Sequence, residues 1–170
     1  MASNTKTDGN LKTAFAGESQ ANRRYLFFAE KADNEGHPQI ARLFRAAAAA
    51  ETVHAKRHFN AMDGAGSTKD NLTAAVAGEY HEFSEMYPAF IKEAEKENNV
   101  KATISFGRAN SVEKIHHGLF EAALKALEAK QPLKEESYFV CGVCGYTVAG
   151  EAPEKCPICG ALRVLFTKVD

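Results

Sequence analysis

Four cysteines near the C-terminal end of the chain form two Cys-x-x-Cys pairs, Cys141 with Cys144 and Cys156 with Cys159. Thiolates with this spacing bind zinc or a single iron ion in a tetrahedral site, and the spacing alone leaves both metals open. A glycine follows each pair, which lets backbone amides turn towards the sulfur atoms. Disulfides would be the alternative in a secreted protein, but nothing in the sequence indicates export. The cysteines therefore predict a metal site.

A second set of candidate ligands is a repeated Glu-x-x-His motif. Glu51 is followed by His54 and Glu113 by His116, at an offset of 62 (113 − 51). Residues three apart on a helix project from the same face, so each motif offers one oxygen and one nitrogen to a single metal ion. One such motif is weak evidence, because it occurs by chance in helical proteins. Two at a matching offset indicate a shared metal centre.

A further glutamate precedes each Glu-x-x-His. Glu18 and Glu79 both follow Ala-Gly, at an offset of 61 (79 − 18). Both lie on apolar helical stripes that carry no lysine or arginine. A buried unpaired carboxylate is costly, so these glutamates need cations beside them or must stay protonated. A glutamate from each of two helices plus Glu-x-x-His from each of two others is the donor set of ferritin-like di-iron proteins. The repeat therefore predicts a di-iron centre.

Glu82 is a fifth acidic candidate, one turn after Glu79, where the first segment has Ala21 instead. Two ferrous ions carry four positive charges, which the four repeated glutamates balance, whereas two ferric ions carry six and favour another hard anionic ligand. We expect one iron to rely on His54 when reduced and on Glu82 when oxidised. His81 points away from both neighbouring glutamates on a helix and is predicted to be solvated rather than a ligand.

The elements that position these residues are predicted to be helices from about residue 11 to residue 129, a stretch rich in strong helix formers. Glycine, proline and asparagine breaks fall at 36–38, 64–67, 98–99 and 131–132 and bound four segments. At 1.5 Å per residue each helix is about 40 Å long, which suits an antiparallel four-helix bundle. Pro88 lies inside the third segment and predicts a kink or bulge rather than a helix end.

The composition changes after Pro132, where a charged connector leads into short β-branched and aromatic runs. We expect two domains, an all-α ferritin-like four-helix bundle over 1–132 and a small β-rich domain held by the four cysteines over 137–170. So few residues cannot bury enough apolar surface to fold unaided, and a metal would supply the missing stabilisation.

Charge and hydropathy exclude several classes of protein. The 170 residues carry 21 basic and 22 acidic side chains, with no basic block that would favour nucleic acid or an anionic membrane. No stretch approaches the roughly 20 apolar residues that cross a bilayer, and the polar N-terminus lacks the apolar centre of a secretory signal. We therefore expect a soluble cytoplasmic protein.

Taken together, the motifs resemble rubrerythrin over almost the whole chain. The matching segments are 14–25 (AFAGESQANRRY), Glu51-x-x-His54, 78–82 (GEYHE) followed by Met86-Tyr87-Pro88, and Glu113-x-x-His116. The tail Cys141-x-x-Cys144-Gly-Tyr with Cys156-Pro-x-Cys159-Gly resembles the rubredoxin-like domain of that family.

The resemblance implies a non-haem di-iron peroxidase that reduces hydrogen peroxide to water and protects against oxidative stress. It implies one iron on the four cysteines, for which zinc is a possible substitute, relaying electrons from an NAD(P)H-linked reductase or rubredoxin. It also allows an oxo bridge in the oxidised di-iron pair. The implied di-iron ligands are Glu18, Glu51, His54, Glu79, Glu82, Glu113 and His116. Tyr25 and Tyr87 match family tyrosines that hydrogen-bond to the carboxylate ligands near the peroxide pocket, where they and Glu82 are the implied catalytic residues.

The resemblance further implies a homodimer in which the rubredoxin-like domain of one subunit serves the di-iron site of its partner. The sequence leaves open whether helices are exchanged between subunits. The alternative function is a ferritin-like protein that takes up or oxidises iron, with a zinc-ribbon tail. Glu82 and the attached cysteine module argue against it, because iron storage needs neither.

Overall fold

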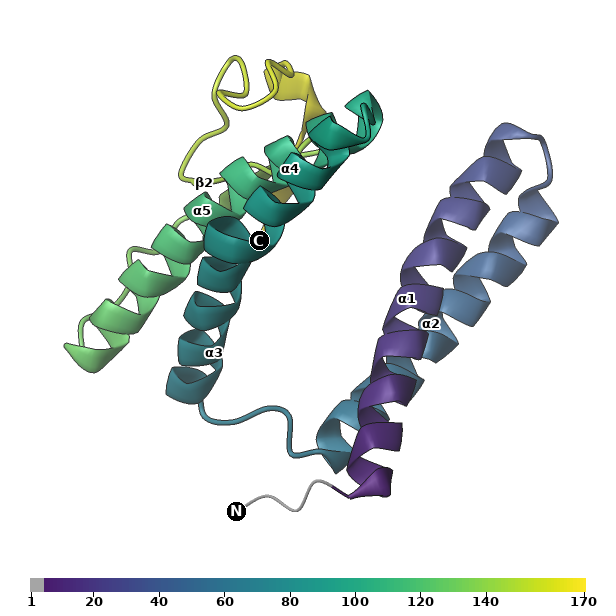
Figure 1. Cartoon of the computed structure of the whole chain (residues 1–170), viewed down its shortest axis with the longest axis horizontal. Coiled ribbons are helices and arrows are strands. Elements are labelled where there is room, and N and C mark those ends of the chain that lie inside the picture. Colours follow the sequence, from purple (N-terminus) through teal and green to yellow (C-terminus); the bar gives the residue numbers. More distant parts are fainter. Residues whose placement is uncertain (1–4) are drawn as a thin grey trace. The chain divides into compact units, whose positions relative to one another are not determined.

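The computed structural model describes residues 5–170, most of which are helical (Figure 1). The chain divides into two compact units, one ending at Gly66 and the other comprising Ser67–Asp170. The first unit holds α1 (Lys6–Asn34) and α2 (Pro38–Ala61). The second holds α3 (Thr68–His81), the π-helical turn η1 (Glu82–Met86), α4 (Tyr87–Lys96), α5 (Val100–Glu128) and a small C-terminal sheet.

The first unit is a hairpin of two long helices, α1 and α2 (Figure 1). The turn passes through Gly36, whose φ of +78° lies in the left-handed region that glycine adopts without strain. The buried residues of both helices are all alanines: Ala21, Ala29, Ala32, Ala41, Ala48 and Ala55. Because alanine carries only a methyl group, the two backbones can approach closely, and this holds polar groups on one helix within reach of the other.

The third helical segment of the chain is interrupted by a π-helical turn. In η1 the amide of Tyr87 donates to the carbonyl of Glu82, five residues back, and Pro88 follows within the first turn of α4. Proline has no N–H to donate and disfavours the regular helix before it, so an extra residue in the preceding turn accommodates it. The prediction of a kink or bulge at Pro88 is confirmed.

The C-terminal sheet is three-stranded and antiparallel, in the order β2-β1-β3. Its strands are β1 (Tyr138–Cys141), β2 (Thr147–Ala149) and β3 (Phe166–Val169). Residues 163–165 form a 3-10 turn, η2 (Arg163–Leu165), so the last strand begins only at Phe166. Cys141 and Cys156 are among the buried residues of this region.

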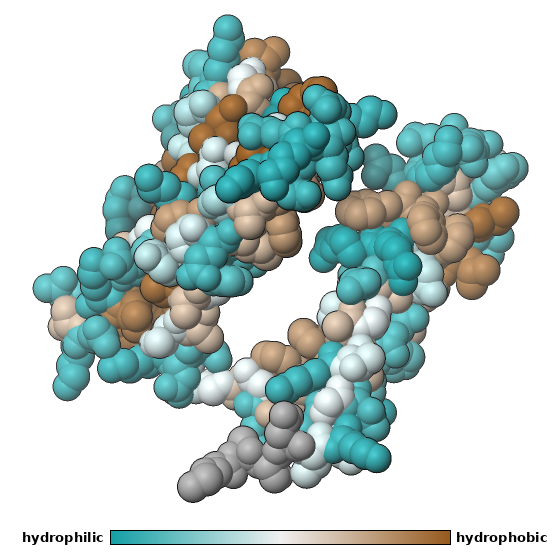
Figure 2. Space-filling model, viewed as in Figure 1, coloured by the Kyte–Doolittle hydropathy of each residue, from teal (hydrophilic) through white to brown (hydrophobic). Residues whose placement is uncertain are grey.

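The fold class agrees with the sequence-based expectation: four long helical segments precede a small sheet that carries four clustered cysteines. Within residues 5–170 no helix combines the length and apolar composition of a membrane span. Apolar side chains also lie on the surface of both units (Figure 2), and Leu43 on α2 is 68% exposed. The division into domains at 1–132 and 137–170 stays a prediction.

Candidate metal centres

The four cysteines lie together in the second unit. The Sγ atoms of Cys141 and Cys159 are 3.7 Å apart, those of Cys144 and Cys156 are 3.5 Å apart, and all four lie within 4.8 Å of one another. A tetrahedral metal with bonds of about 2.3 Å places its sulfur ligands about 3.7 Å apart. The four thiols therefore fit a single zinc or iron ion.

The backbone repeats the same turn at both cysteine pairs. Gly145 donates its N–H to the carbonyl of Cys141, and Gly160 donates to the carbonyl of Cys156, each at 2.9 Å. Both glycines have positive φ, +83° and +75°, which residues with a side chain rarely adopt. The turn after each cysteine pair therefore requires a glycine at this position.

The pKa values of Cys144 and Cys156 are shifted in opposite directions when no metal is bound. Burial raises the pKa of Cys144 to about 12, although the amide of Tyr146 donates to its sulfur and acts to lower the pKa. Burial also raises the pKa of Cys156, but amides of Cys159 and Ile158 donate to that sulfur and bring the pKa down to about 7. A bound cation would favour the thiolate form of Cys144 despite its burial, which again fits a metal.

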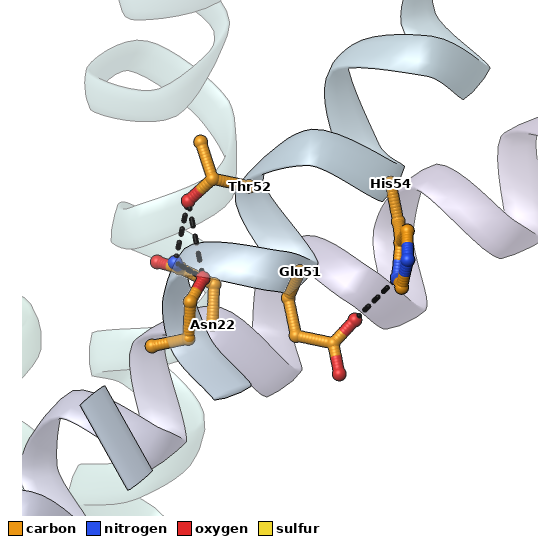
Figure 3. Close-up of polar contacts among 5 residues, drawn as sticks. Asn22, Glu51, Thr52 and His54 are labelled. Carbon is orange, nitrogen blue, oxygen red and sulfur yellow. Dashed lines mark hydrogen bonds and ion pairs between the residues drawn. The ribbon is translucent and has the colours of Figure 1, made fainter. Parts of the chain in front are cut away.

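The first unit brings together Glu18 of α1 with Glu51 and His54 of α2, whose ligand atoms lie within 4.8 Å of one another. The Nδ1 atom of His54 lies 3.0 Å from Oε2 of Glu51 (Figure 3), and the histidine side chain is 54% exposed. Two carboxylates and one imidazole are a suitable donor set for iron, so this triad fits the predicted ligation.

Asn22 fixes the two helices of the hairpin beside this triad. Its side-chain amide donates to the carbonyl of Ala48 at 2.7 Å and to Oγ1 of Thr52 at 2.9 Å (Figure 3). Asn22 lies one turn after Glu18, and Thr52 is next to Glu51, so the contact sets the register in which the two glutamates meet. Sequence reasoning missed Asn22, although its position four residues after a predicted ligand was an available signal.

The second unit brings together Glu79 of α3 with Glu113 and His116 of α5, again within 4.8 Å. The Nδ1 atom of His116 lies 2.8 Å from Oε2 of Glu113 and 3.8 Å from Oε2 of Glu79. The same Glu79 oxygen is buried and has no hydrogen-bond partner among the described residues. Burial and the charge of Glu113 raise the pKa of Glu79 to about 7, although His116 acts against them. An additional positive charge is needed here, which fits a metal ion.

The other ring nitrogen of His116 contacts the cysteine-bearing sheet. Its Nε2 atom lies 3.0 Å from Oγ1 of Thr147 in β2. A cavity of about 520 Å³ adjoins this contact and is lined by Leu72, Glu79, His116, Leu119, Phe120, Ala123, Tyr138 and Thr147. Sequence reasoning did not identify Thr147, because nothing in the spacing of residues relates β2 to α5.

The remaining candidates lie around the triads. Glu82 lies in η1, and its charge contributes to the raised pKa of Glu79 and of Tyr87. The pKa of Tyr87 is raised first by burial and then by Glu113, Glu82 and Glu79, so its phenol lies beside carboxylates. Tyr25 packs against aromatic rings of its own hairpin. His81 is 61% exposed and pairs with Glu85 at 3.3 Å, as expected of a solvated residue.

Comparison with known proteins matches both parts of the chain to family models. Residues 9–124 match the model described as rubrerythrin. Residues 139–167 match the model described as the rubredoxin-like domain of rubrerythrin. The first match includes both Glu-Glu-His triads, and the second includes all four cysteines.

Individual relatives are similar along nearly their full length. Rubrerythrin-2 of Clostridium acetobutylicum is 38% identical, with 96% of each chain covered. Nigerythrin of Nitratidesulfovibrio vulgaris is 39% identical, with 93% of this chain and 84% of the relative covered. Among solved structures, nigerythrin in a mixed-valence state aligns with a TM-score of 0.57 at 38% identity, covering 99% of this chain and 92% of the other.

Proposed function

This chain belongs to the rubrerythrin family, and from that premise we propose that it is a peroxidase that reduces hydrogen peroxide to water. Family membership supports the coarser statement that it is an oxidoreductase with a di-iron site and a rubredoxin-type site. The observation that carries the finer proposal is the contact between the two kinds of site in one unit, through His116 and Thr147.

We propose that the two triads, together with Glu82, hold two iron ions, and that the four cysteines hold a third. The bound iron pair would supply the two electrons that cleave the O–O bond of peroxide, and it would then be returned to its reduced state through the cysteine centre. Solved nigerythrin structures described as mixed-valence and as fully reduced with all iron ferrous support redox-active iron in a relative.

The side chains of this protein would bind the substrate and supply protons. Reduction of one peroxide molecule to two waters consumes two electrons and two protons. The phenol of Tyr87, which lies beside the carboxylates of Glu113, Glu82 and Glu79, can donate one of these protons. The cavity next to Glu79 and His116 is otherwise lined by apolar side chains and the hydroxyl-bearing Tyr138 and Thr147, and a small polar substrate would be directed to these polar groups.

Glu82 would act as the ligand that changes with oxidation state. We propose that one iron relies on His54 when reduced and on Glu82 when oxidised, because the oxidised pair carries two more positive charges. The exposure of His54 supports this, since an exposed imidazole can leave a metal without leaving an orphaned buried group. If the iron geometry of Glu82→Ala changes between redox states in the same way as that of the unsubstituted protein, this part of the proposal is wrong.

The partners follow from the same proposal. An NAD(P)H-dependent reductase, or a rubredoxin reduced by one, would supply electrons to the cysteine centre in the cytoplasm. We also propose a homodimer. The exposed apolar side chains of α1 and α2 support this, because a subunit interface could bury them. Sedimentation of the iron-loaded protein at micromolar concentration would give twice the 18.5 kDa chain mass.

Metal content and single-turnover kinetics test the function. We expect three irons per chain and a visible iron–thiolate absorption that reductant bleaches and that hydrogen peroxide restores. Oxidation of the reduced protein should be much faster with peroxide than with dioxygen. A colourless cysteine site holding zinc, together with faster oxidation by dioxygen, would instead indicate a ferritin-like protein that oxidises iron.

A further inference from the structure

The hydroxyl of Thr147 bridges the two metal-binding regions of the second unit. Its oxygen donates to the carbonyl of Gly145 at 3.0 Å and lies 3.0 Å from Nε2 of His116. A hydroxyl has a single hydrogen, which is used in the bond to Gly145. Thr147 must therefore accept the hydrogen bond from His116, and this requires Nε2 to carry a hydrogen.

This contact decides which nitrogen of His116 is available to a metal. With the hydrogen held on Nε2, Nδ1 is the nitrogen left for a metal; in the metal-free structure it lies at hydrogen-bond distance from a carboxylate, which only accepts, so a bound metal would replace the hydrogen on Nδ1. That atom faces the carboxylates, 2.8 Å from Oε2 of Glu113 and 3.8 Å from Oε2 of Glu79. A hydrogen bond to the nitrogen that does not bind the metal is the usual way in which proteins orient a ligating histidine.

The same hydroxyl is connected to the cysteine site. Gly145 directly follows Cys144, so its carbonyl is joined to the sulfur by covalent bonds of two neighbouring residues. The turn lies against α5, since a side-chain carbon placed on Gly145 would be 3.8 Å from Val112. Bonds therefore run without a gap from the Cys144 sulfur through Gly145 and the Thr147 hydroxyl to the ring of His116.

We propose that Thr147 is a positioning residue that holds the Nε2–H tautomer of His116 and connects the cysteine centre to the triad of Glu79, Glu113 and His116 in the same unit. The proposal rests on the proposed function for its redox role. With iron in both sites, each transfer would oxidise one ferrous ion held by the cysteines and reduce one ferric ion held by the triads. Two such transfers would restore the iron pair, with the external donor reducing the cysteine centre after each.

Three variants of the full-length iron-loaded protein test the connection. Thr147→Val keeps the shape of the side chain and removes the hydroxyl, while Thr147→Ser retains the hydroxyl. Thr167→Val makes the same change on exposed β3 of the same sheet and is the matched control. The cysteine centre of the fully oxidised protein is reduced by a flash-generated one-electron reductant, and its return to the ferric absorption is followed in time.

We expect Thr147→Val to slow this internal transfer about tenfold or more, in the range typical of second-sphere changes, while Thr147→Ser and Thr167→Val stay near the unsubstituted rate. The midpoint potentials of both centres are measured in each variant, so that a changed driving force is corrected for. An unchanged corrected rate in Thr147→Val would overturn the role of Thr147 as the connection.

The tautomer is tested separately by nitrogen NMR of the full-length chain loaded with zinc, which is diamagnetic. We expect a slowly exchanging Nε2–H of His116 that is lost in Thr147→Val and retained in Thr147→Ser. A signal that stays protected in Thr147→Val would overturn the positioning role. Neither measurement uses peroxide, so a protein that fails to reduce peroxide but responds to Thr147→Val in both ways would refute the proposed function alone.

Discussion

Glu79 is the residue at which charge, burial and metal binding conflict most directly. Its pKa of about 7 lies above the ordinary value of 4.5, first because of burial and then because of Glu113. Between pH 4.5 and pH 7, the folded, metal-free chain therefore keeps a proton on Glu79 that the unfolded chain has released. This contribution to the free energy of unfolding is fully present below pH 4.5 and is lost as the pH rises through 7.

We expect the metal-free chain to lose about 1–2 kcal/mol of stability from this residue between pH 4.5 and pH 8, because solvent screening reduces the full effect of the pKa shift. Glu79→Gln should remove that part of the pH dependence, because an amide does not titrate. Denaturant unfolding of both chains in the presence of a chelator, at a series of pH values, measures the difference. Parallel curves for the two chains would show that Glu79 titrates normally.

Asn22 carries a second prediction at the residue scale. Asn22→Ala removes both hydrogen bonds between α1 and α2, and we expect it to lower the free energy of unfolding by about 1–3 kcal/mol. It should also weaken metal binding by Glu18, Glu51 and His54, because their register depends on this contact. Asn60→Ala, an exposed asparagine on the same hairpin, is the control. Equal metal affinity in both variants would show that the helices hold their register without Asn22.

At the scale of the elements, helix breaks were readable from the sequence and contacts between elements were not. The breaks at Gly36 and Asn98–Asn99 follow from residues that tolerate or favour left-handed or capping conformations, and these are local properties. Asn22 and Thr147 each contact an element distant in the sequence, so their roles depend on packing that periodicity does not encode. The spacing of ligands on a single helix was predictable because it, too, is a local property of the chain.

The π-helical turn gives a prediction of its own at this scale. Pro88→Ala restores a backbone donor that can bond to the carbonyl four residues back, which favours a regular α-helix over η1. We expect no loss of stability, but Glu82 should rotate away and the spectrum of the oxidised iron should resemble that of Glu82→Ala. Pro38→Ala, at the first position of α2, is the matched control and should leave the iron spectrum unchanged. An unaltered oxidised spectrum in Pro88→Ala would show that packing alone holds the bulge.

At the scale of the whole molecule, the repeat in the sequence indicated which candidate metal ligands lie together. The repeated motif identified both triads because each lies within one helical hairpin, where spacing along the chain sets proximity. The compact units separate at Gly66, between the two halves of that repeat, so each unit holds one complete triad. The link from the cysteines to one triad was not predictable, because it depends on how the small sheet packs on α5.

This link makes the two kinds of metal site interdependent, and metal removal tests it. The sheet around the cysteines is too small to fold without its metal, so selective chelation should unfold 137–170 and leave the helical circular dichroism largely intact. Limited proteolysis should then cut within the tail. His116 would lose the acceptor for its Nε2–H, and metal binding to the helical triads should weaken.

Because coupling between binding sites is reciprocal, metal in the triads should in turn raise the temperature at which the iron–thiolate absorption disappears. Thr147→Val should abolish this effect, whereas a rise of equal size in that variant would mean that the sites communicate by another route.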